Sequence, residues 1–175
     1  MVRFVSEFGA QAVPESDAFV EPDRWPDLDW DRLERHHSLQ RAFLDRRVPE
    51  ADHATYASWR EATQAYQATV VRHHVEELRR LKYRPTGGFL QFLLTDAQPA
   101  VSWSLLDHQR VPKAGYQALL EACRPVIVVA DRLPATVTPG EALALYVHVV
   151  SDLRVPLVRA AVTAELTWPG GLRAW

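Results

Sequence analysis

The sequence predicts an α/β segment followed by a β segment, and three features of the 175-residue chain indicate this order. A short apolar run near the start ends in Glu7 and is followed by Gly9. A long helical pattern separates this run from a second apolar run at residues 89–94. After residue 124 the pattern changes to short alternating runs between turn residues, which is typical of antiparallel strands. We therefore expect two domains, residues 1–124 and residues 125–175.

The composition argues against several classes of protein. A hydrophobic content of 47% is enough for one domain of ordinary size or for parts of two. The net charge of −2 argues against nucleic acid as a partner, because proteins that bind it usually carry a basic face. The basic run from Arg79 to Lys82 directly follows acidic residues and indicates the solvated end of a helix.

The single cysteine, Cys123, excludes an internal disulfide and any multi-cysteine metal site, which fits a reducing compartment. No charged leader with an apolar stretch precedes Arg3, and no apolar run approaches the length of a membrane span. We therefore expect a cytoplasmic location and no contact with a membrane.

The run from Val2 to Glu7 is expected to form a strand whose side chains alternate between two faces. Glu7 then lies at the C-terminal end of this strand, and Gly9 lets the backbone turn away. In an α/β barrel, catalytic side chains are carried at this end of the strands. The spacing alone leaves a second interpretation open, in which Glu7 is a solvated residue at an ordinary strand end.

The segment after this strand is loop-like, because it contains three prolines with acidic residues between them. Trp25 and Trp30 stand out in it. Tryptophans in a loop above a barrel mouth either stack on sugar rings or anchor the loop by burying apolar area, and the second role is favoured.

Two helices are expected next. The first covers residues 29–45, with Asp29 as its cap, and ends before Val48 and Pro49. The second starts at Asp52, stops before Pro85, and has apolar residues spaced by three and four along one side. These inward residues are Tyr56, Trp59, Ala62, Tyr66 and Val70.

On the second helix, His73 and Glu77 have the spacing of a metal-binding pair. A solvated helix face is the favoured interpretation, because a second helix with matching ligands is needed and the region from Glu34 to His37 fits poorly. We predict neither a metal nor another cofactor. A metal-dependent enzyme that uses His73 and Glu77 is the weakest of the alternatives.

The second strand, residues 89–94, is nearly continuously apolar, as expected for a strand covered on both faces. It ends at Asp96, so this carboxylate occupies the same type of strand-end position as Glu7. The following loop contains Trp103 and is expected to fold over the same end of the strands. A short helix begins at Pro112 and is expected to point four residues inward. These are Tyr116, Leu119, Leu120 and Cys123, so the cysteine is interpreted as a small core residue.

The β segment is expected to start with a strand at residues 126–130. A turn at Pro139 and Gly140 precedes an alternating run at residues 143–149, and a further run follows at residues 162–168. Short antiparallel strands at these intervals suggest a β-sandwich, of which three strands make only a part.

The ordered motifs of this chain resemble glycoside hydrolase family 2, and most closely its β-mannosidases. The motifs are Arg3-Phe4-Val5-Ser6-Glu7-Phe8-Gly9, the Gly87-Gly88 strand ending in Asp96, Pro99, Ser102-Trp103-Ser104 and Lys113-Ala114-Gly115-Tyr116. The resemblance implies that residues 1–124 form the last two strand-helix units of a TIM (β/α)8 barrel. It also implies that residues from Val126 onward begin an immunoglobulin-like β-sandwich.

The resemblance further implies a substrate with a β-glycosidic bond, a glycoside or oligosaccharide, and a retaining mechanism in which Glu7 is the nucleophile. Phe92, Asp96 and Trp103 are the implied substrate-binding residues. Phe92 and Thr95 stand where β-mannosidases often have tryptophan and asparagine, which leaves the sugar preference open.

The acid/base of the family belongs to an Asn-Glu pair upstream of the nucleophile, whereas only six residues precede Glu7 and the chain contains no asparagine. We therefore expect a fragment that is inactive alone and whose partner is the missing N-terminal part of the enzyme. The alternative is a non-catalytic module that binds carbohydrate or protein through Trp25, Trp30 and Trp103.

Overall fold

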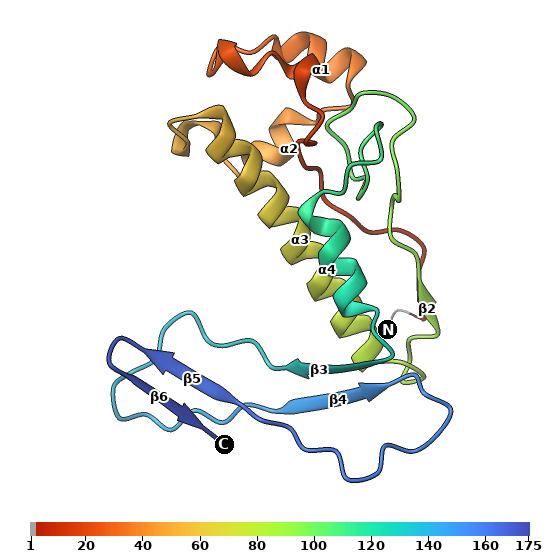
Figure 1. Cartoon of the computed structure of the whole chain (residues 1–175), viewed down its shortest axis with the longest axis vertical. Coiled ribbons are helices and arrows are strands. Elements are labelled where there is room, and N and C mark those ends of the chain that lie inside the picture. The colour runs from red at the N-terminus through yellow and green to blue at the C-terminus, as the bar shows by residue number, and fades with distance from the viewer. Residues whose placement is uncertain (1–2) are drawn as a thin grey trace.

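The computed structural model describes residues 3–175, so Val2 of the first predicted strand lies outside the described residues (Figure 1). An α/β part is followed by a β part, as predicted. The helices are α1 (Trp30–His36), α2 (Arg41–Asp45), α3 (Tyr56–Arg80) and α4 (Ala114–Ala122). The strands are β1 (Phe4–Val5), β2 (Gly88–Phe89), β3 (Val126–Ala130), β4 (Val147–Ser151), β5 (Glu165–Trp168) and β6 (Gly171–Ala174).

Strands β1 and β2 pair in parallel, with α3 in the connection between them. Both are shorter than the predicted runs at residues 2–7 and 89–94. Main-chain hydrogen bonds nevertheless continue past them, from Leu90 N to Val5 O (2.9 Å) and from Phe92 N to Phe8 O (2.8 Å). The two chain segments therefore stay side by side as far as Phe92.

The second apolar run is not covered on both faces, contrary to the expectation. Leu90, Phe92 and Leu94 are 58%, 40% and 55% exposed, and Phe4 on β1 is 54% exposed. The reason is that the sheet has two strands, and among the described residues no third strand pairs with either. The opposite face is covered, because Val5, Phe8 and Phe89 pack against the C-terminal half of α3 and against α4.

The predicted helix at residues 29–45 is two helices, α1 and α2. Asp29 caps α1 as predicted, since its carboxylate accepts a hydrogen bond from Arg32 N at 3.1 Å. The break follows from Gln11, whose side chain donates to Ser38 O (2.6 Å) and accepts from Gln40 N (2.8 Å). These tertiary hydrogen bonds use backbone groups that a continuous helix would pair internally.

Helix α3 begins at Tyr56 and not at Asp52, because Thr55 accepts a hydrogen bond from Ser58 N (3.2 Å) and caps it. Its buried face also differs from the predicted one. Tyr56 and Trp59 are buried, but Ala62, Tyr66 and Val70 are only partly buried. The remaining buried positions of α3 are Thr63, Gln64, Gln67, Val71, Val75 and Arg79.

Helix α4 packs along α3 (Figure 1) through the small residues Gly115, Ala118 and Ala122. A Cβ atom on Gly115 would lie 2.5 Å from Gln67 Oε1, so glycine allows this close approach. The predicted inward face is therefore wrong for two residues, since Leu120 and Cys123 are exposed. Small side chains decide the contact, because they let the helix axes come closer than leucine would.

Trp25 and Trp30 pack against the largest core cluster, together with Trp59 of α3. The ring of Trp25 lies 5.3 Å from that of Trp59, and its indole N–H donates to His53 O at 3.2 Å. Trp30 meets Trp59 edge-on at 5.8 Å. Both tryptophans thus anchor the long loop, which is the role that the sequence favoured.

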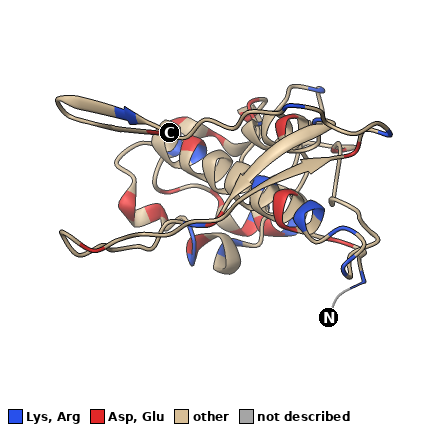
Figure 2. Ribbon diagram, turned by 90° about the horizontal axis from the view of Figure 1, so that it is seen from below, with Lys and Arg blue, Asp and Glu red and all other residues tan. Residues whose placement is uncertain are grey.

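The β part consists of two antiparallel ribbons, β3–β4 and β5–β6. The first predicted strand matches β3, the second is displaced to residues 147–151, and the third is shortened to residues 165–168. Strand β6 was not predicted; it pairs with β5 through a turn at Gly170, whose φ is +93°. Figure 2 shows acidic and basic residues interspersed along the helices and few of either on these strands.

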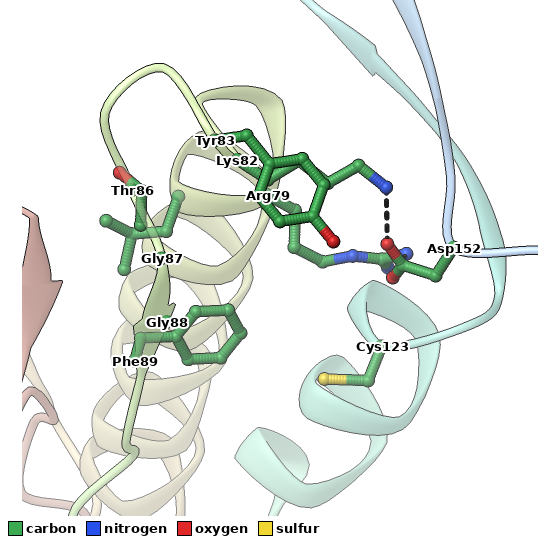
Figure 3. A pocket seen from close by; sticks show the side chains of 10 residues that line it. Arg79, Lys82, Tyr83, Thr86, Gly87, Gly88, Phe89, Cys123 and Asp152 are labelled. Carbon is green, nitrogen blue, oxygen red and sulfur yellow. Dashed lines mark hydrogen bonds and ion pairs between the residues drawn. The ribbon is translucent and has the colours of Figure 1, made fainter.

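A cluster of charges joins the β3–β4 ribbon to the helices (Figure 3). Arg79 of α3 is 6% exposed, donates to Ala122 O at the end of α4, and pairs with Asp152 at 2.6 Å. Lys82 pairs with the same carboxylate at 2.5 Å. Hydrogen bonds from these cations, Lys82 first, hold the pKa of Asp152 below its usual value. Asp152 thus fixes the end of β4 to the end of α3.

Replacing Arg79 should loosen this junction. We expect Arg79→Ala to lower the free energy of unfolding by about 1 to 3 kcal/mol, because it leaves Ala122 O without that donor and removes one of the two cations that hold Asp152. Amide hydrogen exchange in residues 126–130 and 147–151 should accelerate as well. The control is Arg35→Ala, whose pair with Asp31 lies on the exposed surface and is worth less than about 1 kcal/mol. Equal effects of the two substitutions would contradict the role of Arg79.

Candidate functional site

Three of the predicted site residues line one hollow, just beyond the ends of β1 and β2. Glu7, Phe92 and Trp103 border it with Phe8, Gly9 and Gln40, and its volume is about 410 Å³. This volume lies within the range of small-molecule sites. The fourth predicted residue, Asp96, is not among the residues that line the hollow.

Gly9 is needed here for close packing and not for a left-handed turn. A Cβ atom at this position would lie 2.3 Å from the carbonyl oxygen of Phe92 and 3.4 Å from Trp103. The ring of Phe92 lies 5.9 Å from that of Trp103 at an interplanar angle of 57°. The absence of a side chain on Gly9 therefore lets the backbone beside Glu7 approach both aromatic residues.

Glu7 is exposed, and it carries the single carboxylate among the residues that line this hollow. It follows β1 by two positions, where the chain still runs beside residues 90–92. The hollow thus offers one carboxylate next to the rings of Phe92 and Trp103, and Phe92 is 40% exposed. Aromatic faces beside polar groups are suited to sugars, whose rings have apolar C–H faces and polar edges.

Asp96 is buried and its carboxylate is occupied by neighbours. Ser102 Oγ donates to Asp96 Oδ1 at 2.6 Å, and Ser104 Oγ donates to Asp96 Oδ2 at 2.5 Å. These two serines flank Trp103 in the sequence. Asp96 therefore holds the turn that carries Trp103 through the serines on either side of it.

Lys113 completes this buried network and is 1% exposed. Its Nζ donates to Ala12 O and to Ser102 O, both at 3.2 Å, and lies 4.0 Å from Asp96 Oδ2. Burial lowers the pKa of this ammonium to about 8, against the opposing effect of Asp96 and Asp107. The cation thus joins the segment after Glu7 to the turn that carries Trp103.

Sequence reasoning gave no role at this site to Gln40 or to Lys113, although Lys113 belongs to one of the family motifs. Gln40 lies between α1 and α2, inside a predicted helix, so no local pattern assigned it to a hollow. Lys113 precedes a helix and resembles an ordinary solvated lysine in sequence. The residues that reveal its burial lie 11 and 101 positions away.

The described part of the chain holds no group of three or more His, Cys, Asp or Glu side chains that could bind a metal ion. Glu77, which has the spacing of a metal-binding pair with His73, forms an ion pair with Arg80 at 2.5 Å. Within residues 3–175, no helix combines the length and the apolar run that a membrane crossing needs.

Truncating Asp96 should release Trp103. We expect Asp96→Ala to lower the free energy of unfolding by about 2 to 4 kcal/mol, since it removes two charge-assisted hydrogen bonds and leaves Lys113 unpaired. The ¹⁹F resonance of 5-fluorotryptophan at Trp103, assigned with Trp103→Phe, should move toward the value of a solvent-exposed indole. Asp96→Asn keeps the shape and is expected to move it less. An unchanged resonance in Asp96→Ala would contradict the positioning role.

The buried Lys113 makes stability depend on alkaline pH. Its pKa is about 8 in the folded protein and 10.5 ordinarily, so between these values the unfolded chain binds more protons. The free energy of unfolding should therefore rise with pH across this window, by at most about 3 kcal/mol. Urea denaturation at pH 7, 9 and 10.5 should show this rise in the native chain relative to Lys113→Met. A difference that stays constant with pH would contradict the lowered pKa.

No protein-family model matches the chain. Three fungal proteins named β-mannosidase B are similar to it over 138 residues, which are 72% of this chain and 16% of theirs. The identity is 32% for the protein from Aspergillus niger and 30% for those from Aspergillus flavus and Aspergillus oryzae.

The fold is similar to that of a solved crystal structure, β-D-mannosidase from Dictyoglomus thermophilum. The TM-score is 0.67 and the identity 24%, with 85% of this chain and 18% of that chain covered. The chain thus spans about a sixth of the length of the relatives that it matches. The resemblance implied by its motifs is confirmed, and the chain is a relative of one part of the β-mannosidases.

Proposed function

We propose that this chain is part of a retaining glycosidase of family 2 that hydrolyses β-glycosidic bonds, with β-mannosides as the first candidate substrates. The observation that carries the proposal is the hollow in which Glu7 lies beside Phe92 and Trp103. The similarity to proteins named β-mannosidase supports the choice of sugar. Residues 1–124 would then be the last two strand-helix units of a TIM barrel, and residues 125–175 the start of an immunoglobulin-like domain.

In the proposed mechanism Glu7 is the nucleophile. Its carboxylate attacks the anomeric carbon and forms a glycosyl ester, while the bond to the leaving oxygen breaks. A second carboxyl group about 5 Å away protonates that oxygen and then deprotonates the water that releases the sugar. The exposed position of Glu7 fits the first role, since a nucleophile must stay ionised and reach its substrate.

Phe92 and Trp103 would bind the sugar through their ring faces, and Asp96 would act by positioning Trp103. The hydrogen bonds from Ser102 and Ser104 support this assignment, because they occupy both carboxylate oxygens of Asp96. Asp96 is thus proposed as a positioning residue and not as a group that contacts substrate.

The second carboxyl group would come from a part of the catalytic domain outside this sequence. The apolar face of Phe4, Leu90, Phe92 and Leu94 supports this, because further strands of a barrel would cover it. An open two-stranded sheet also has free edges that pair readily with other strands. We infer that the chain alone has no useful glycosidase activity.

Two assays test the proposal. The purified chain should show no turnover of aryl β-mannosides, β-glucuronides or β-galactosides. A chimera should be active on aryl β-mannosides when this chain replaces the corresponding region of the Aspergillus niger relative. In that chimera, Glu7→Gln should lower kcat by at least about 10³-fold, since the nucleophile is lost.

Glu61→Gln in the same chimera is a matched control, because Glu61 is exposed on α3 outside the hollow. It should leave the activity unchanged. A chimera with equal activity before and after Glu7→Gln would contradict the role of Glu7. Turnover by the chain alone that is lost in Glu7→Ala would contradict only its inactivity in isolation.

A further inference from the structure

A second hollow adjoins the one that contains Glu7. Its volume is about 320 Å³, and it shares Gly9, Gln40 and Trp103 with the first. The two hollows therefore meet along one border. A ligand whose reacting bond lies beside Glu7 would therefore place one of its two ends in the second hollow.

The second hollow is bordered by two cations and by no carboxylate. Arg46 and Arg47 follow α2, are exposed, and line it beside Phe43. The guanidinium of Arg46 lies 5.4 Å from the ring centre of Phe43, a cation–π contact that keeps it near the hollow. Within residues 3–175, neither arginine takes part in an ion pair. All six arginines of α1 and α3, in contrast, are paired with acidic side chains.

Gln40 lies at the border and has an unused amide. Gln11 fixes its backbone, because Gln11 Oε1 accepts from Gln40 N at 2.8 Å. The side-chain amide of Gln40 makes no hydrogen bond to any of the described residues. It is therefore a free donor and acceptor at the point where the two hollows meet.

We propose that the second hollow binds the leaving group of the substrate and that this group carries a carboxylate, as a uronic acid does. This inference rests on the proposed function, which assigns the first hollow to the sugar that Glu7 attacks. Gln40 binds a hydroxyl group near the scissile bond, and Arg46 and Arg47 bind the carboxylate. The planar guanidinium matches a carboxylate with two parallel hydrogen bonds.

The charges explain why two arginines are needed. The carboxylate of Glu7 would repel a second carboxylate in the adjoining hollow. Two nearby cations reverse the sign of the electrostatic potential there, so that the second carboxylate is attracted. Because both arginines are exposed, salt should screen the attraction strongly. The preference for an acidic leaving group should therefore be large at low ionic strength and small at high ionic strength.

The test is calorimetric binding of the full chain to two probes of equal shape, 4-carboxyphenyl β-mannoside and the neutral 4-carbamoylphenyl β-mannoside. At 20 mM salt the acidic probe should bind about tenfold more tightly, and at 500 mM salt about twofold. Arg46→Gln with Arg47→Gln should abolish the difference between the two probes. The circular dichroism spectrum and the melting temperature of this variant should match those of the native chain, which shows that it is folded.

Arg154→Gln with Arg159→Gln is the matched control, because it removes the same charge from two exposed arginines of the β part. It should keep the tenfold preference. Equal binding of both probes to the native chain, or loss of the preference in the control, would overturn the assignment of the second hollow while the proposed function stands. Binding of neither probe would also overturn the assignment of the second hollow, while the activity of the chimera decides the proposed function separately.

Discussion

The side chains of α3 satisfy backbone groups of the two irregular segments that build the site, and the rest of the structure depends on these hydrogen bonds. Gln67 Nε2 donates to Ala10 O (2.9 Å) and to Ser104 O (3.0 Å), which joins the segment after Glu7 to the turn that carries Trp103. Gln64 Nε2 donates to Val13 O at 3.0 Å. Buried backbone groups outside a helix or sheet need such partners. The hollow keeps its shape because one helix holds both of its walls.

The sequence predicted the existence of α3 but neither its bounds, Tyr56–Arg80, nor its buried face. Its apolar residues recur at helical spacing, which is a local property, and therefore indicate a helix correctly. Thr63, Gln64 and Gln67 are polar, so a hydrophobic pattern assigns them to solvent. They are buried because they form hydrogen bonds with other segments of the chain, and these partners lie 37 to 57 positions away. No local pattern contains those partners.

Strand-end reasoning had a similar limit at the site. The family resemblance supplied Phe92 and Trp103, which line one hollow with Glu7, whereas strand-end reasoning placed only the two carboxylates. That reasoning gave Asp96 the same position but not its direction, and the carboxylate instead meets Ser102 and Ser104. A strand end fixes the position of a residue, while its rotamer depends on which donors are close. The division of the chain at residue 124 remains a prediction.

The middle of α3 and its C-terminal end use different chemistry because they face different groups. Near the site the partners are backbone carbonyl and N–H groups, and glutamine serves both since its amide donates and accepts. Gln64 does so, donating to Val13 O and accepting from Ala114 N at 3.0 Å. Near the β3–β4 ribbon the partners are carbonyls and carboxylates, which only accept, and there α3 carries Arg79 and Arg80. The change from amide to guanidinium side chains along α3 thus follows from the groups that each part of the helix binds.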